Sequence, residues 1–395
     1  MGAGVLFLPI NAGIGGIWTL LIITVLAFPI TYFSHRALAR FILSATSANS
    51  GITGVIGEYF GSTVSKIFTI IYFLAIYTIL LMYAVAITNT VQSFIVNQMH
   101  LPEPPRAIVA IVLILGLMFI VRFGQDIIMR AMSLLVYPFI GSLIFMGIYL
   151  ILKWNNTIFD TTNISVMGAG QSIFITLWIA FPVLVLSFNH YAIISPFVVT
   201  QRQRYGDTAA DAKCAQIQRY GYLLMVFTVL FFVYSCVLSL SPAGLALAKE
   251  QNISILSYLA NHFQTPMIAY LSPIIAFIAI TKSFLGHSIG AYEAMRDIVV
   301  ETAQVFGNSL NKKVVDLIIV IFMVLTCWYT AYTNPSIIGI IETISGPTGA
   351  VILFLLPMYA IRKIPQLAKY RGKISNVFVV VIGLITVSAI FYTLL

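Results

Sequence analysis

Charged side chains are scarce in this 395-residue chain, at 8% of residues against 60% hydrophobic, and the mean hydropathy is +1.00. A soluble domain carries about a quarter charged residues, so a soluble fold is excluded. The regular alternation of apolar and polar residues typical of a membrane β-barrel is also missing. No loop is long enough to bury a core of its own. The composition therefore predicts an all-α polytopic membrane protein, with one domain over residues 1–395.

Enzyme signatures are absent too, since the chain has no HExxH, no GxSxG and no phosphate-binding loop. We therefore expect no enzymatic activity, no cofactor and no metal site. The three cysteines, Cys214, Cys236 and Cys327, lie in apolar runs or a basic loop and are predicted to pack rather than to form disulfides. The net charge of +9 does not indicate nucleic acid, because basic residues also hold cytoplasmic loops in place.

Uncharged runs long enough to span a bilayer predict eleven helices, the first of them a half-helix. The tenth is interrupted at Gly346 and Pro347, and a short interfacial piece is expected at 51–60. The predicted spans are about 5–11, 16–43, 65–96, 105–122, 126–152, 170–199, 215–240, 265–298, 314–332, 335–361 and 374–394.

Basic residues are distributed unevenly over the loops that join these runs. Of the 21 Lys and Arg residues, 17 fall in alternate loops, and Lys282 lies inside a span. The other three, Arg106, Lys153 and Lys249, fall in the remaining loops. Cytoplasmic loops are the basic ones in membrane proteins. The distribution predicts the orientation and places the C-terminus on the periplasmic side.

Two spans contain helix-breaking or polar residues at corresponding places. One holds Gly2-Ala3-Gly4 and Pro9, and the other holds Ser187-Phe188-Asn189-His190 and Pro196. The breaks lie five helices apart, an odd number, so the two halves would have opposite topology. Such a pattern is typical of transporters built from inverted repeats. We predict repeats at about 1–153 and 170–361 and an additional helix at 374–394. The alternative is chance, because Gly and Pro are common in membrane helices.

Broken helix ends can bind an amino acid through backbone groups. Free N–H groups at a half-helix N-terminus favour a carboxylate, and free carbonyl groups favour an ammonium group. Glycine lets the backbone approach closely. Ser187, Asn189 or His190 could contact a substrate hydroxyl, while Phe188 could cover the ligand or simply pack. The predicted substrate-binding residues are Gly2, Ala3, Gly4, Tyr77, Ser187, Phe188, Asn189 and His190.

Lys282 follows 19 uncharged residues, Phe263 to Thr281, and is central in its predicted helix. A buried ammonium group is unfavourable and readily loses its proton. Lys282 is therefore the main candidate for proton coupling, with Ser283 beside it and His190 as a second proton-sensitive group. Glu342 is the other buried charge. It is a further candidate for proton coupling, and it could pair with Lys282 or be a structural partner for a neighbouring backbone.

Five segments together resemble the bacterial hydroxy and aromatic amino acid permease family, and most of all its proton-coupled serine transporters. They are GAGVLFLP at 2–9, VRFG at 121–124, SFNH at 187–190, KEQNIS at 249–254 and ITKSFLGH at 280–287. The resemblance covers nearly the whole chain. It implies a LeuT-like five-plus-five inverted repeat with helices 1 and 6 broken and helix 11 additional. It also implies location in the bacterial inner membrane and import of L-serine, or threonine, with protons.

Two alternative functions stay open, and the chain differs from the family pattern at one place. An aromatic or other neutral amino acid permease and a non-transporting amino acid sensor remain open. Family members carry the inner half of helix 1 before the Gly-Ala-Gly break, and this chain begins at that break. Either Met1 is a misplaced start or the first half of helix 1 is missing, and in the second case we expect leaky or abolished coupling. The expected partners are L-serine or a related amino acid, protons and the lipid bilayer.

Overall fold

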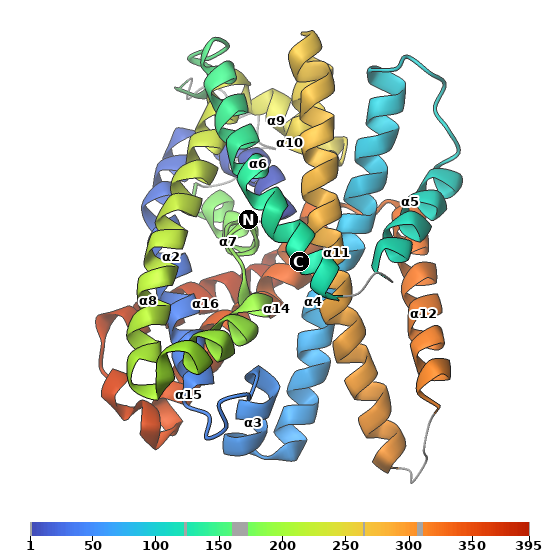
Figure 1. Ribbon diagram of the computed structural model, residues 1–395. Helices are drawn as coiled ribbons and strands as arrows, with labels where there is room; N and C mark the ends of the chain where they lie inside the picture. The colour runs from blue at the N-terminus through green and yellow to red at the C-terminus, as the bar shows by residue number, and fades with distance from the viewer. Residues whose placement is uncertain (1, 122–124, 160–172, 264, 306–310, 395) are drawn as a thin grey trace.

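The computed structural model describes residues 2–121, 125–159, 173–263, 265–305 and 311–394 (Figure 1). Within these ranges the chain forms helices and no β-strand. Among the described residues, eight helices are long and apolar enough to cross a membrane, and two more are apolar but shorter. The prediction of an all-α polytopic membrane protein is confirmed. Part of the VRFG segment, residues 122–124, and the predicted start of the second repeat, residues 170–172, lie outside the described residues.

The first half of the chain follows the predicted spans closely. Long uncharged runs become single helices because every backbone polar group in hydrocarbon needs an internal partner. The helices are η1 (Ala3–Leu6), α1 (Leu8–Ile14), α2 (Gly16–Leu43), α3 (Ile52–Phe60), α4 (Ser62–Asn97), α5 (Arg106–Val121) and α6 (Gln125–Ile151), followed by the turn η2 (Thr157–Phe159).

The second half contains the same kinds of element with more interruptions. Its helices are α7 (Ile173–Ser187), α8 (Tyr191–Ser239), α9 (Pro242–Glu250), α10 (Ile255–Phe263), α11 (Pro266–Val305), α12 (Lys312–Thr333), α13 (Ile337–Ile340), η4 (Ile341–Ser345), α14 (Gly346–Ala350), η5 (Val351–Leu355), α15 (Leu356–Lys363), η6 (Pro365–Tyr370) and α16 (Ile374–Leu394). Helices α9 and α10 were not predicted from the sequence, because each is too short to appear as a spanning run.

Helices 1 and 6 are both broken where the sequence indicated. Helix 1 starts as the 3₁₀ turn η1, and α1 follows after Phe7. The sixth membrane helix, called helix 6 here, consists of α7 and the first part of α8. Helix α7 ends at Ser187 and α8 begins at Tyr191, so residues 188–190 are not helical. Helix α8 then continues through a kink at Gly206, whose φ is +72°. Glycine adopts this left-handed conformation without steric strain.

The tenth membrane helix, called helix 10 here, runs from α13 to α15. Two π-helical segments, η4 and η5, interrupt it in place of one break at Gly346 and Pro347. Gly346 has a different role, which is close packing. A Cβ atom there would lie 2.4 Å from the Pro182 Cβ atom of α7. This contact holds helix 10 against the first part of helix 6, and a larger residue would separate them.

The bundle has two distinct ends and a buried centre. Helices α9 and α10 cover one end, and α3 and α15 lie at the opposite end (Figure 1). Helix α11 packs along α4, α2 packs along α8, and α1 lies against α9. Residues 3–13, which include η1 and most of α1, are buried inside this packing. The first break is therefore surrounded by other helices, as a ligand site requires.

Candidate functional site

The two helix breaks meet in the interior of the bundle. The Ser187 hydroxyl lies 3.1 Å from the Gly4 carbonyl oxygen and 2.7 Å from that of Val183, to both of which it can donate. A Cβ atom on Gly4 would lie 3.3 Å from the Ser187 Cα atom. Glycine at this position thus permits the backbones to approach. The structure brings together Gly4 and Ser187, which the sequence analysis predicted as parts of one site.

Helix α11 joins the first break through Ser283. The Ala3 N–H group donates a hydrogen bond to Ser283 Oγ at 2.8 Å, and Ser283 in turn donates to the Ala279 carbonyl. This contact satisfies one backbone donor of the 3₁₀ turn, which would otherwise lack a partner. Ser283 and its neighbour Lys282 are therefore positioned beside the break.

Helix α4 contributes Tyr83, and not the predicted Tyr77, to the first break. The Tyr83 hydroxyl lies 3.6 Å from the position of a Cβ atom on Gly2. The Tyr77 hydroxyl instead forms a hydrogen bond with Thr326 of α12, and its ring stacks on Phe322. The two tyrosines point about 120° apart around the helix. Sequence spacing could not show which of these faces the break.

Tyr191, the first residue of α8, was also not among the site residues predicted from the sequence. Its side chain is 3% exposed, and its hydroxyl has no hydrogen-bond partner within the described residues. Its ring packs edge-on against Tyr72 of α4. A buried hydroxyl without a partner is destabilising by about 1–3 kcal/mol. Such a group next to a helix break indicates a place where a ligand or a water molecule binds.

Phe188 and Asn189 shape the second break. Asn189 Oδ1 accepts a hydrogen bond at 3.0 Å from the N–H group of Tyr191, two residues further along the chain, so this side chain holds the turn that leads into α8. Its amide nitrogen would lie 3.3 Å from a Cβ atom on Gly349 of α14. Phe188 is 2% exposed, and its carbonyl oxygen lies 2.9 Å from His190 Nδ1. Phe188 is therefore a packed residue, and Asn189 holds the turn before α8.

His35 of α2 completes the second break, and the sequence analysis did not identify it. The His190 N–H group donates to His35 Nε2 at 3.0 Å, across 155 positions of sequence. The rings of the two histidines lie 5.9 Å apart, and Tyr222 of α8 packs against both. His35 directly precedes Arg36, so the sequence suggested only the cytoplasmic end of a helix. Its 1% exposure shows that it is instead buried.

Lys282, which precedes Ser283 on α11, is buried with an aromatic ring as its neighbour. The residue is 5% exposed, and its ammonium nitrogen lies 5.2 Å from the ring centroid of Phe139 on α6. None of the ion pairs between described residues includes it. A cation–π contact compensates only part of the lost hydration of an ammonium group. The position is therefore unfavourable for a charge unless an anion arrives.

Glu342 does not pair with Lys282. It accepts hydrogen bonds from Asn11 Nδ2 at 3.0 Å and from Lys249 Nζ at 3.2 Å. Its side chain is 8% exposed and that of Lys249 is 38% exposed. These contacts join α1, α9 and η4. The sequence left open a pair with Lys282 or with a neighbouring backbone, and the printed partners of Glu342 among the described residues are instead the side chains of Asn11 and Lys249.

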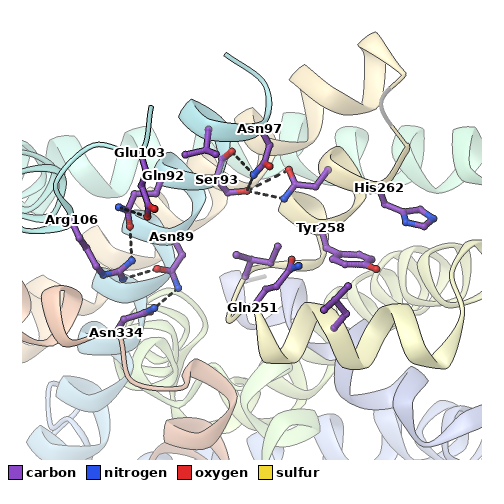
Figure 2. Close-up of a pocket in the computed structure, with 14 residues that line it drawn as sticks. Asn89, Gln92, Ser93, Asn97, Glu103, Arg106, Gln251, Tyr258, His262 and Asn334 are labelled. Atoms are coloured by element: carbon purple, nitrogen blue, oxygen red, sulfur yellow. Dashed lines mark hydrogen bonds between the residues drawn. The ribbon is translucent and has the colours of Figure 1, made fainter. Parts of the chain in front are cut away.

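A separate polar cavity of about 480 Å³ lies near α9 and α10 (Figure 2). Arg106 lines it and donates three hydrogen bonds, to Gln92 and Asn89 at 2.6 Å each and to the Ala331 carbonyl at 2.7 Å. Figure 2 shows Asn89, Arg106 and Asn334 on the same side of the cavity. None of the predicted site residues lines it. The network ties α4, α5 and α12 together.

Comparison with known proteins gives consistent matches over the whole chain. The tryptophan/tyrosine permease family model matches residues 1–393. The serine transporter SdaC of Escherichia coli strain K12 is 55% identical over 395 residues, which cover 100% of this chain and 92% of that protein. The threonine/serine transporter TdcC of Escherichia fergusonii is 42% identical over 408 residues, covering 99% and 92%.

A solved structure with the same architecture is that of MhsT in complex with L-phenylalanine. It has a TM-score of 0.52 and 15% sequence identity, and the match covers 99% of this chain and 97% of that chain. At this identity the likeness concerns the fold alone. It confirms the LeuT-like fold that the family resemblance implied.

Proposed function

Since the chain belongs to the tryptophan/tyrosine permease family, we propose that it imports L-serine, or threonine, together with protons. Family membership makes it a multi-pass membrane transporter of amino acids and not an enzyme. The observation that carries the proposal is the contact of the two breaks at Gly4 and Ser187. It lies in a chain whose relatives are named serine and threonine/serine transporters.

In this proposal the unwound backbone binds the charged groups common to all amino acids. The N–H groups at the start of α8 bind the carboxylate, as helix N-termini do. Carbonyl oxygens of Gly2, Ala3 and Gly4 bind the ammonium group. Ser187, Asn189 or His190 contacts the substrate hydroxyl, and Phe188 bounds the site. Polar groups that are left unpaired by alanine would discriminate against it.

Two tyrosines extend this substrate site beyond the predicted residues. Tyr83 is close to Gly2, and the Tyr191 hydroxyl lacks a partner within the described residues. A substrate hydroxyl or carboxylate would supply the missing hydrogen bond. Tyr77 has its own partner in α12 and is a weaker candidate for direct contact.

Proton coupling is assigned in this proposal to Lys282, with Ser283 as its link to the first break. An ammonium group is unfavourable in hydrocarbon without a counter-charge. A change in its protonation therefore changes how stably α11 packs beside Ala3, to which Ser283 is bonded. Glu342 contributes only when its pair with Lys249 separates, which would occur as the α9 end opens. His190 stays a second candidate.

We further propose that the protein lies in the bacterial inner membrane with its C-terminus in the periplasm. The loops rich in Lys and Arg would then be cytoplasmic. Helices α9 and α10, with Lys249, would face the periplasm, and α3 and α15 would face the cytoplasm (Figure 1). Cysteine labelling from each side of the membrane would test this orientation.

The transport proposal is tested by uptake of labelled L-serine into proteoliposomes with an imposed pH gradient. We expect accumulation that collapses when a protonophore removes the gradient. Competition with unlabelled threonine, tryptophan, tyrosine and alanine defines the substrate class. The family description makes an aromatic substrate the second candidate, and inhibition by tryptophan or tyrosine but not by serine would favour it. Binding of serine without uptake would favour a sensor.

A further inference from the structure

His35 holds the second helix break through the backbone of His190, and both of its ring nitrogens are engaged. Nε2 faces the His190 N–H group at 3.0 Å, and Nδ1 faces the Thr31 carbonyl oxygen at 2.7 Å. The backbone N–H group can only donate, and the carbonyl oxygen can only accept. His35 must therefore be neutral, with its proton on Nδ1.

The neighbouring hydroxyl agrees with this assignment. Ser34 Oγ lies 3.3 Å from His35 Nδ1 and donates its own proton to the Ile30 carbonyl at 2.6 Å. It can therefore accept from Nδ1–H but cannot donate to that nitrogen. Three contacts thus determine one tautomer, which is the one that leaves Nε2 as an acceptor for the break.

Few other titratable groups face His35. His190 and Tyr222 are its ring neighbours, at 5.9 Å and 5.1 Å between ring centroids. Lys282 of α11 interacts electrostatically with His190. No carboxylate forms an ion pair with His35 in the described part of the chain.

We propose that His35 is a proton-operated latch on the broken helix 6. When Nε2 takes up a proton, His35 becomes an imidazolium ion and Nδ1–H stays bonded to Thr31. Nε2–H and the His190 N–H group are then two donors facing each other, so their hydrogen bond is lost. The second break is released, and its first N–H group becomes available. His35 is thus a positioning residue for the ligand site.

Release of the second break by protonation of His35 would couple proton binding to substrate binding. This step rests on the proposed function, in which the N–H groups at the start of α8 bind the substrate carboxylate. When His35 is neutral, its Nε2 atom accepts the hydrogen bond of the His190 N–H group, which is then not available to the substrate carboxylate. In the protonated state that donor is available and a positive charge lies beside it. Proton binding and substrate binding therefore favour the same state and strengthen each other, as thermodynamic linkage requires.

The latch itself is tested without any substrate, by hydrogen exchange followed by mass spectrometry. The peptide containing residues 187–194 is measured in the empty full-length protein between about pH 8 and about pH 5, with rates corrected for intrinsic exchange. We expect its protection to fall about tenfold on acidification. His35→Gln keeps an acceptor for the His190 N–H group and a donor for Thr31 but cannot be protonated. In that variant, protection should remain constant.

Two further variants keep this test decisive. His262→Gln is the matched control, because His262 also stacks on a tyrosine, Tyr258, but lies on α10 away from the break. It should show the same fall as the parent protein. His190→Ala removes the neighbouring ring and keeps the N–H group, so it should also show the fall. If it does not, His190 is the titrating group and the proposal is overturned, even where His35→Gln cannot be purified.

The coupling is tested by binding of labelled L-serine at each pH. The parent protein should bind serine about tenfold more tightly at the acidic end of the range, within the usual span of allosteric coupling. The affinity of His35→Gln should change by less than about twofold. An unchanged pH dependence in His35→Gln overturns the latch. Absence of serine binding in every protein would instead contradict the proposed substrate, and the exchange measurement would still decide about His35.

Discussion

Replacement of Gly4 by alanine tests whether the two breaks form one site. The new Cβ atom would lie 3.3 Å from the Ser187 Cα atom and 3.4 Å from the Leu186 carbonyl oxygen. Both are backbone atoms, so neither can rotate away as the end of a side chain would. The second break must move by a few tenths of an ångström to admit the methyl group. We expect this shift to weaken the hydrogen bond from Ser187 to the Gly4 carbonyl.

The expected magnitude follows from these two effects. The hydrogen bond of 3.1 Å between neutral groups contributes about 1 kcal/mol net. Overpacking at a backbone contact adds about 1 kcal/mol. Together they amount to about 2 kcal/mol, or about a 30-fold loss of affinity if all of it appears in substrate binding.

The assay is equilibrium binding of labelled L-serine to the purified protein, with Gly2→Ala as the matched control. A Cβ atom on Gly2 would meet the Tyr83 hydroxyl at 3.6 Å and Ser283 Oγ at 3.7 Å, which are ordinary contacts. The loss of serine affinity in Gly2→Ala should therefore be at most about threefold. In a Ser187→Ala background, Gly4→Ala should lose about half of its effect, because the shared hydrogen bond is already absent while the overpacking on backbone atoms remains. Equal losses in both glycine variants, or full additivity with Ser187→Ala, would refute the reasoning.

The remaining predictions concern buried polar groups. Lys282→Ala should abolish accumulation of serine driven by a pH gradient and leave serine exchange partly intact, and unchanged accumulation would remove Lys282 from the mechanism. Tyr191→Phe should leave the melting temperature of the empty protein equal or higher, because it removes a buried hydroxyl without a described partner, and should weaken serine binding about fivefold. A large loss of stability would show that the hydroxyl is bonded in the empty protein. Glu342→Gln and Lys249→Met should each destabilise the protein by roughly 1 kcal/mol, since Lys249 is partly exposed. In thermal unfolding the double variant should resemble either single variant, and additive losses would contradict a direct pair.

The helices and the breaks could be predicted from residues close together in sequence. A run of some 20 apolar residues has few stable states in a bilayer other than a spanning helix. Polar residues such as Ser187 and Asn189 inside such a run are tolerated only in a protected place. These local constraints were enough to locate the break before Tyr191 and to pair it with the one at Gly4.

The partners of the buried polar groups could not be predicted in this way. Periodicity shows that Tyr77 and Tyr83 lie on different faces of α4, but packing decides that Tyr83 is the one near Gly2. Likewise, the sequence makes Glu342 a buried charge without naming its partner. Asn11, 331 positions away, and Lys249 meet it only because α1, α9 and η4 converge.

The sequence by itself therefore determined a membrane-embedded helical protein with two broken helices, because hydrophobic length and polar interruptions act locally along the chain. The tertiary structure alone decided which groups surround the breaks. His35 is the clearest example, since nothing near it in sequence indicates that its Nε2 atom accepts the His190 N–H group. That contact exists because α2 packs along α8, and packing between distant helices is not written in local periodicity.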